Sequence, residues 1–188
     1  IIHIISVVRK NFIMYSSEEI LAMINQGLAE LQLERQPFGL YQPIRYVLDA
    51  GGKRIRPVLL LLTYNMYKDD LSPAMPSAIG IETYHNYTLL HDDVMDRAEV
   101  RRGRACVHKV WDENTAILSG DSMLVMAYQL MANCPEEYLK EVLTLFTDTA
   151  LEIGEGQQYD VDFEKRLDVK PEEYIEMIRL KTSVLLAC

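Results

Sequence analysis

The chain has 188 residues, of which 49% are hydrophobic and 25% charged, and its mean hydropathy is −0.04. This composition is that of a globular chain long enough to bury a core within one domain. Its 9 Gly and 7 Pro exclude fibrous, collagen-like and disordered classes. With 19 Lys and Arg against 28 Asp and Glu, the net charge is −9. This charge argues against nucleic-acid binding, which requires a basic surface.

The cysteines indicate the cellular compartment. Cys106, Cys134 and Cys188 are odd in number and show no CxxC spacing. This pattern is typical of a reducing compartment and predicts neither a disulfide framework nor a zinc site. No apolar run approaches the roughly 18–20 residues that a bilayer span requires. We therefore expect a cytoplasmic protein without a transmembrane segment.

The first residues differ from the rest of the chain. Residues 1–8 are mostly apolar and are followed by Arg9 and Lys10. No basic residue precedes this run and no small-residue cleavage site follows it, so it is a poor signal peptide. Met14 is a more natural beginning. We therefore treat residues 1–13 as an extension of unknown role and residues 14–188 as the domain.

The periodicity is helical from Ser16 onward. Ser16 and Glu19 have the spacing of a capping box at the start of the first helix. An apolar stripe then follows at helical spacing: Ile20, Leu21, Ile24, Leu28 and Leu31. A second helix is expected to end at Gly51-Gly52.

A third helix is expected to begin near Pro57, which suits a first turn, and to run through residues 58–67. Because it is apolar almost all round, we expect it to be central. A loop containing Pro73 and Pro76 precedes a long helix that reaches about Asp96. Further helices are expected at 111–132, 136–163 and 171–187. Strand-like alternation is nearly absent, so the sequence predicts one all-α domain.

The long helix carries an acidic motif, His85-x6-Asp92-Asp93-x-x-Asp96. At about 100° per residue, Asp92 and Asp96 each lie within about 20° of His85 around the helix, whereas Asp93 points about 80° away. Two carboxylates one turn apart repel each other unless a cation lies between them. Such oxygen ligands suit Mg²⁺, which is commonly shared with substrate phosphates.

The alternative is a solvated acidic face. We disfavour it because Leu89 and Leu90 directly precede the cluster and the surrounding helix is apolar. Carboxylates that are pushed toward an interior need a partner.

Two basic segments flank this helix in the sequence, GGKRIRP at residues 51–57 and RRGR at residues 101–104. Guanidinium groups bind phosphate oxygens in pairs, a Lys adds a compact charge, and backbone amides at a helix start contribute further donors. Either segment alone could be a surface salt-bridge patch. Together with the acidic motif, they predict a diphosphate site.

Five motifs occur together in one order: GGKRIRP (51–57), HNYTLLHDDVMD (85–96), RRGR (101–104), GQQYD (156–160) and KT (181–182). In this order and spacing the chain, from Met14 to its end, resembles the trans-isoprenyl diphosphate synthases of the polyprenyl synthetase family. The resemblance implies an antiparallel helical bundle of the isoprenoid synthase type. The family's second Asp-rich motif does not occur before Cys188, so we expect the bundle to be incomplete at its C-terminal side.

The resemblance also implies roles for individual residues. Those that match positions holding the diphosphate of isopentenyl diphosphate are Lys53, Arg56, His85 and Arg102. Those that match Mg²⁺ ligands bridging to the allylic diphosphate are Asp92 and Asp96, with Asp160 as a supporting carboxylate. Those that match further contacts to this leaving group are Arg101 and Lys181. Those that match positions beside the allylic carbons are Thr182 and Gln157.

The implied activity is that of a Mg²⁺-dependent prenyltransferase in isoprenoid biosynthesis, acting as a homodimer. Its substrates would be isopentenyl diphosphate and an allylic diphosphate, which react by ionisation, condensation and elimination. Tyr87, five positions before Asp92, would place a floor under the product tunnel and favour roughly C15 to C20 products. The alternative for Tyr87 is plain core packing.

Three other functions are compatible with part of this motif set. An HD-type phosphohydrolase, suggested by His85 and His91-Asp92, needs a further upstream His, for which only His3 is available, and leaves the basic segments unexplained. A terpene cyclase shares the acidic motif but has no use for GGKRIRP. A non-catalytic partner subunit is favoured by the missing second motif and opposed by the intact first one.

Overall fold

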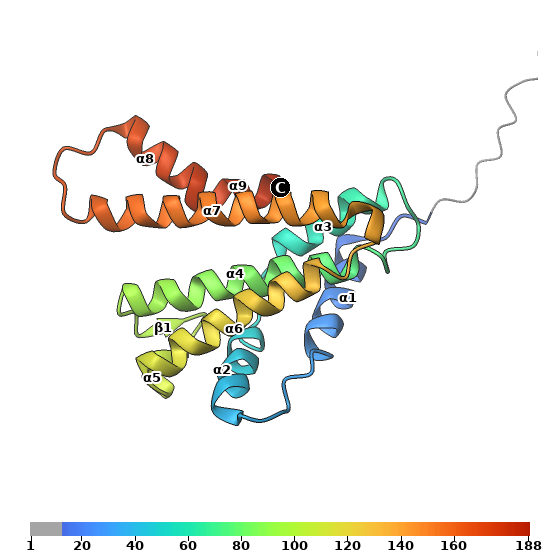
Figure 1. Cartoon of the computed structure of the whole chain (residues 1–188), viewed down its shortest axis with the longest axis horizontal. Coiled ribbons are helices and arrows are strands. Elements are labelled where there is room, and N and C mark those ends of the chain that lie inside the picture. The colour runs from blue at the N-terminus through green and yellow to red at the C-terminus, as the bar shows by residue number, and fades with distance from the viewer. Residues whose placement is uncertain (1–12) are drawn as a thin grey trace, which may run out of the picture.

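The computed structural model describes residues 13–188, so the predicted N-terminal extension lies outside the described residues except for Ile13. Helices form nearly all of the regular structure in this range (Figure 1). The exception is a small antiparallel hairpin of β1 (Val100–Arg101) and β2 (Arg104–Ala105). The predicted all-α fold is confirmed.

The helices agree with the predicted ranges to within a few residues, and one short helix was not predicted, α5. Their bounds are α1 Ser17–Ala29, α2 Phe38–Leu48, α3 Ile55–Asn65, α4 Met75–Met95, α5 Val107–Val110, α6 Glu113–Met131, the 3₁₀ turn η1 Glu136–Tyr138, α7 Leu139–Phe163, α8 Pro171–Ile178, the π-helical turn η2 Arg179–Ser183 and α9 Val184–Ala187.

The first two helix ends show how local chemistry sets these bounds. The predicted capping box is present, with the Ser16 hydroxyl accepting from the Glu19 amide and the Glu19 carboxylate accepting from the Ser16 amide. The predicted end of the second helix was a little too late. Helix α2 ends at Leu48, and the chain then takes positive φ angles of 75° at Gly51 and 138° at Gly52.

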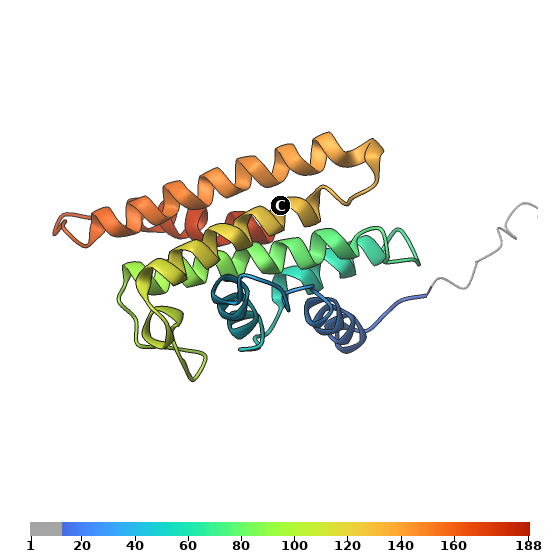
Figure 2. The same ribbon diagram turned by 60° about the horizontal axis from the view of Figure 1, so that its bottom comes forward.

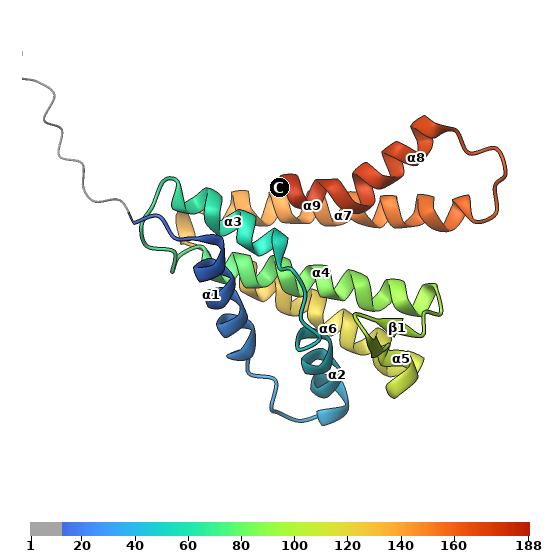
Figure 3. The ribbon, with the colours of Figure 1, turned by 180° about the vertical axis from the view of Figure 1, so that it is seen from behind.

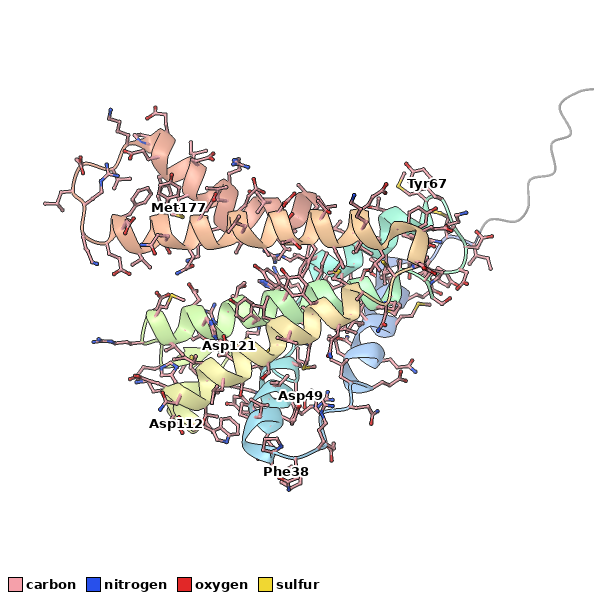
Figure 4. All side chains as sticks on the ribbon, in the orientation of Figure 1. Phe38, Asp49, Tyr67, Asp112, Asp121 and Met177 are labelled. Carbon is pink, nitrogen blue, oxygen red and sulfur yellow. The ribbon has the colours of Figure 1, made fainter. Side chains whose placement is uncertain are left out.

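The central helix is α4, and the expectation that α3 would be central is wrong. Every residue of α4 from Ala78 to Tyr84 is buried, and the most extensive contact of α4 is with α6. On α3, by contrast, Ile55 and Leu59 are 49% and 44% exposed. Tyr67, just beyond α3, is also exposed and projects outward (Figure 4). Apolar composition alone did not reveal which sides of α3 would be covered.

The helices lie in layers on either side of α4 and α6, which run side by side (Figures 1 and 2). On one side, α1, α2 and α3 pack on this pair and form the larger core, which contains Ile20, Ile44 and Leu61. On the other side lie α7 and the returning segment α8–η2–α9, which folds back along α7 (Figures 1 and 3). This second core contains Phe146 and Val184. Helix α4 contributes to both cores, so its motifs lie between the two layers.

None of the helices in the described part of the chain combines the length and apolar character needed to cross a membrane. All three cysteines are free thiols, as expected, and Cys106 is buried.

Candidate active site

The first basic segment forms the rim of a cavity of about 440 Å³, here called the basic cavity. After Gly51 and Gly52, Arg54 adopts the left-handed conformation (φ 48°), and α3 begins at the next residue. This conformation is uncommon for a residue with a side chain. The side chains around the cavity that carry polar chemistry are Lys53, Arg54, Arg56, Glu82, His85 and Arg102.

His85 faces the cations of this cavity. Its Nε2 lies 3.3 Å from Nη1 of Arg56. Burial, reinforced by the charges of Arg56 and Arg102, lowers the pKa of His85 to about 3. The imidazole is therefore neutral at physiological pH, and it can share hydrogen bonds with Arg56 without adding a charge.

The second basic segment divides between two places. Arg102, in the turn between β1 and β2, donates to the Gly51 carbonyl and, over 3.2 Å, to Oδ1 of Asn86. Gly52 makes this approach possible, because a Cβ there would lie 2.9 Å from Cζ of Arg102. The adjacent Arg101 turns instead toward the acidic motif. The structure thus brings Arg102, but not Arg101, to the first basic segment.

A second cavity of about 380 Å³, here called the central cavity, lies between α4, α7 and η2. Asp92, Gln157, Lys181 and Thr182 all line it. Nζ of Lys181 lies 3.1 Å from Oδ1 of Asp92 and 2.6 Å from Oδ2 of Asp160. Burial alone would lower the pKa of Lys181, but its hydrogen bonds to Asp160 and Asp92 outweigh burial and raise it. Lys181 is therefore a fixed positive charge between two helices.

Lys181 reaches this position because η2 approaches α7 closely. At Gly156 of α7, a Cβ would lie 2.3 Å from the Lys181 backbone nitrogen and 2.8 Å from the carbonyl carbon of Leu180. Any side chain there would push the backbone of η2 away. The glycine of the GQQYD motif thus serves the packing that places Lys181 and Thr182.

The three aspartates of the acidic motif have different surroundings. Asp93 is buried and accepts from Arg101 Nε at 2.8 Å and Nη2 at 2.6 Å, in line with its predicted orientation away from His85. Asp92 lines the central cavity and lies 3.5 Å from the same guanidinium. Asp96 caps α4, is exposed, and is not among the residues lining the cavity. The pKa of Asp96 is raised, first by the partial loss of solvent around its carboxylate and then by the negative charge of Asp92.

Within residues 13–188, no three His, Cys, Asp or Glu side chains are already gathered around one metal position. The carboxylates nevertheless converge on a cation, because the Lys181 ammonium bridges Asp92 of α4 and Asp160 of α7. Oxygen ligands from two helices around a positive charge suit a hard divalent ion. The donor set therefore fits Mg²⁺ by its chemistry.

The two cavities adjoin, because Arg56 and His85 line both of them. The far walls of the central cavity are apolar and include Tyr84, Ala150 and Ile153. Tyr87 also lines it, with its ring 4.8 Å from the ring of His91. The polar ends of the two cavities thus adjoin an apolar space.

Sequence reasoning gave no role to three polar residues in or beside the wall of the basic cavity, Arg54, Glu82 and Asn86. Arg54 and Glu82 form a buried ion pair of 2.7 Å, and Asn86 is fully buried beside them. A signal existed, because Glu82 is a lone acid in an apolar stretch three residues before His85. Residues three and four apart share a helix face.

The profile of the polyprenyl synthetase family matches residues 38–188. The chain is 43% identical over 166 residues to the geranylgeranyl pyrophosphate synthase of Geoglobus acetivorans, covering 87% of this chain and 52% of that protein. It is 40% identical over 166 residues to the geranylgeranyl diphosphate synthase of Methanosarcina mazei, covering 87% and 51%. The chain therefore spans about half the length of the curated relatives that it matches.

Solved structures of similar proteins have the same fold. A crystal structure of a geranylgeranyl pyrophosphate synthase superposes with a TM-score of 0.89 and 48% identity, covering 93% of this chain and 54% of that one. The geranylgeranyl pyrophosphate synthetase of Pyrococcus horikoshii gives a TM-score of 0.83 and 40% identity, covering 89% and 54%.

Proposed function

This chain belongs to the polyprenyl synthetase family. From that premise we propose that it forms part of a Mg²⁺-dependent trans-prenyltransferase. The reaction would join isopentenyl diphosphate to an allylic diphosphate. One observation carries the proposal: a basic cavity and an acid-lined central cavity adjoin through Arg56 and His85. Two diphosphates bound there would have their carbon chains side by side.

The basic cavity would hold isopentenyl diphosphate. Lys53, Arg56 and Arg102 line it, and among the described residues none of the three is paired with a carboxylate. Guanidinium forks suit the paired oxygens of a diphosphate. The neutral His85 adds a hydrogen bond without competing for the negative charge.

The central cavity would hold the allylic diphosphate. Asp92 and Asp96 would be the Mg²⁺ ligands, with Asp160 as a supporting carboxylate. When bound, Mg²⁺ would stabilise the negative charge of the departing diphosphate. Lys181 and Arg101 would add fixed positive charge to the same leaving group. Both already lie beside Asp92, at 3.1 Å and 3.5 Å.

The reaction follows from this placement. The allylic C–O bond breaks, the diphosphate departs with the electron pair, and an allylic carbocation remains. The double bond of isopentenyl diphosphate attacks this cation to form the new C–C bond, and a proton then leaves to the released diphosphate. Gln157 and Thr182 present oxygens that can stabilise the developing positive charge, and the apolar walls exclude water.

Finer properties belong to the same proposal. Tyr87 lines the central cavity and packs on Tyr84 at 5.5 Å between ring centroids, which suits a floor for the growing chain. A product of roughly C15 to C20 would follow, since pocket size limits chain length. We further propose a cytoplasmic location and a homodimer, with residues 14–188 forming the N-terminal portion of the synthase domain.

The deciding experiment is incorporation of labelled isopentenyl diphosphate into longer prenyl diphosphates with Mg²⁺. It should be run on this chain and on the full-length gene product. Activity in either form supports the enzyme, and activity in the longer form alone would make this chain its substrate-binding part. Incorporation in neither form would remove the enzyme and favour a non-catalytic partner subunit, which co-purification with an unlike chain would support.

A further inference from the structure

A polar network in the wall of the basic cavity joins the two basic segments. Its members are Arg54, Glu82, Asn86 and Arg102, and the first three are 5%, 2% and 0% exposed. Buried charges persist in proteins only when they are paired. The network is therefore an integral part of the folded structure. No step of the proposed reaction uses Glu82 or Asn86.

One branch of the network holds the loop before α3. Oε1 of Glu82 accepts from Nη1 of Arg54 at 2.7 Å, and Nη2 of Arg54 donates to the Leu48 carbonyl at 2.6 Å. Arg54 thus ties the end of α2 to α4 while its own backbone stays left-handed. Because the Arg54 side chain points inward, the neighbouring Lys53 remains exposed at the cavity rim.

The other branch holds the second basic segment. The same Glu82 oxygen accepts from Nδ2 of Asn86 at 2.9 Å, and Oδ1 of Asn86 accepts from Nη1 of Arg102 at 3.2 Å. Nδ2 also donates to the Glu82 backbone carbonyl at 2.8 Å, and the two bonds together fix which way the Asn86 amide faces. Oδ1 is then left for Arg102. The Glu82 carboxylate therefore contacts Arg54 directly and Arg102 through Asn86, so it links cations from both basic segments.

We propose that Glu82 is a positioning residue for the homoallylic diphosphate, acting through Arg54 on the loop and through Asn86 on Arg102. The inference rests on the proposed function of the basic cavity. Glu82 is the one carboxylate among the residues described as lining that cavity, and it pairs with Arg54. Lys53, Arg56 and Arg102 consequently stay available for an anion, in fixed positions.

The test is a titration of the chain with isopentenyl diphosphate, with geranyl diphosphate plus MgCl₂ as the second probe. Glu82→Gln should weaken isopentenyl diphosphate binding about tenfold, since the charge holding Arg54 is lost. Its affinity for geranyl diphosphate should stay within about twofold of the unmodified chain. Glu155→Gln is the matched control, because Glu155 is exposed on α7 and its change alters the net charge equally.

Glu82→Gln leaves the charge of the buried Arg54 unpaired and could therefore destabilise the fold. A second variant separates that effect from the loss of positioning. The double variant Arg54→Gln/Glu82→Gln removes both charges and should unfold at nearly the same urea concentration as the unmodified chain. It should still bind isopentenyl diphosphate about tenfold more weakly, because the loop has lost its anchor. Asn86→Ala should weaken the same binding about threefold, because it removes one of the two hydrogen bonds that hold Arg102 and leaves the one to the Gly51 carbonyl.

The outcomes separate the two proposals. If the unmodified chain binds neither diphosphate, the proposed function fails, and this inference fails with it. If the unmodified chain binds both and the folded Glu82 variants match it for isopentenyl diphosphate, only the role of Glu82 is overturned. Equal weakening for both diphosphates would also overturn that role, because it would indicate a general structural defect.

Discussion

The two halves of α4 differ in how their charged side chains are paired. Around residues 82–86, one buried carboxylate pairs with one buried arginine, and among the described residues the other cations that line the basic cavity have no carboxylate partner. At residues 92 and 93, the carboxylates pair with cations from other elements: Asp92 with Lys181 of η2 and Arg101 of β1, and Asp93 with Arg101.

This difference has a chemical consequence. The basic cavity is preorganised, because Lys53, Arg56 and Arg102 need not leave a carboxylate before they meet an anion. In the central cavity, a ligand or metal must exchange with ion pairs that already exist. We therefore expect substitutions at Asp92 to affect turnover and those at 82–86 to affect substrate binding.

The largest expected effect is at the acidic end. Asp92→Asn in the full-length gene product should slow turnover on the order of 10³-fold, since it removes a carboxylate from the proposed metal position. Initial rates with labelled isopentenyl diphosphate at saturating Mg²⁺ measure this. Circular dichroism should show an unchanged helix content. A loss below tenfold would mean that Asp92 is not part of the metal site.

The neighbouring aspartate should behave differently and so sharpen the contrast within the motif. Asp93→Asn removes the buried carboxylate that accepts two hydrogen bonds from Arg101. This loss should reduce the free energy of unfolding by about 2–3 kcal/mol. Urea unfolding of the chain measures it, with Asp148→Asn on the exposed face of α7 as the control. Equal stability of the two variants would contradict the buried role of Asp93.

His85, at the basic cavity, predicts that the stability of the chain depends on pH. The pKa of His85 is about 3 in the folded chain and about 6.5 when unfolded. Because the folded value is lower, its contribution is complete above pH 6.5 and is lost as the pH falls toward 3. Between pH 7 and pH 5 the chain should lose about 2 kcal/mol that His85→Gln does not lose. Parallel urea titrations at both pH values decide this, and identical losses would refute it.

The smallest effect on rate is expected between the two ends, at Tyr87. Tyr87→Ala should leave both charged regions intact and turnover nearly unchanged, while the product gains at least one isoprene unit. Chromatography of the labelled products measures chain length. An unchanged product would make Tyr87 a packing residue and move the floor to its ring neighbour Tyr84.

Local chemistry made much of this molecule predictable. The capping box at Ser16, the prolines at helix starts and the 3.6-residue periodicity depend on neighbours in sequence, and they gave the helices to within a few residues. The orientation of Asp93 away from His85 followed from helix geometry alone. The motifs GGKRIRP and HNYTLLHDDVMD indicated the family before any contact was known.

Only the tertiary structure decided how those residues meet. Sequence spacing could not show that Lys181 bridges Asp92 and Asp160, because that contact spans 89 residues and depends on the close approach of η2 to Gly156. Nor could it show that Arg54 points inward to Glu82 while Lys53 stays exposed. Such choices depend on burial and long-range packing, which local propensity does not encode. They determine which charges are neutralised and which remain available to bind a substrate.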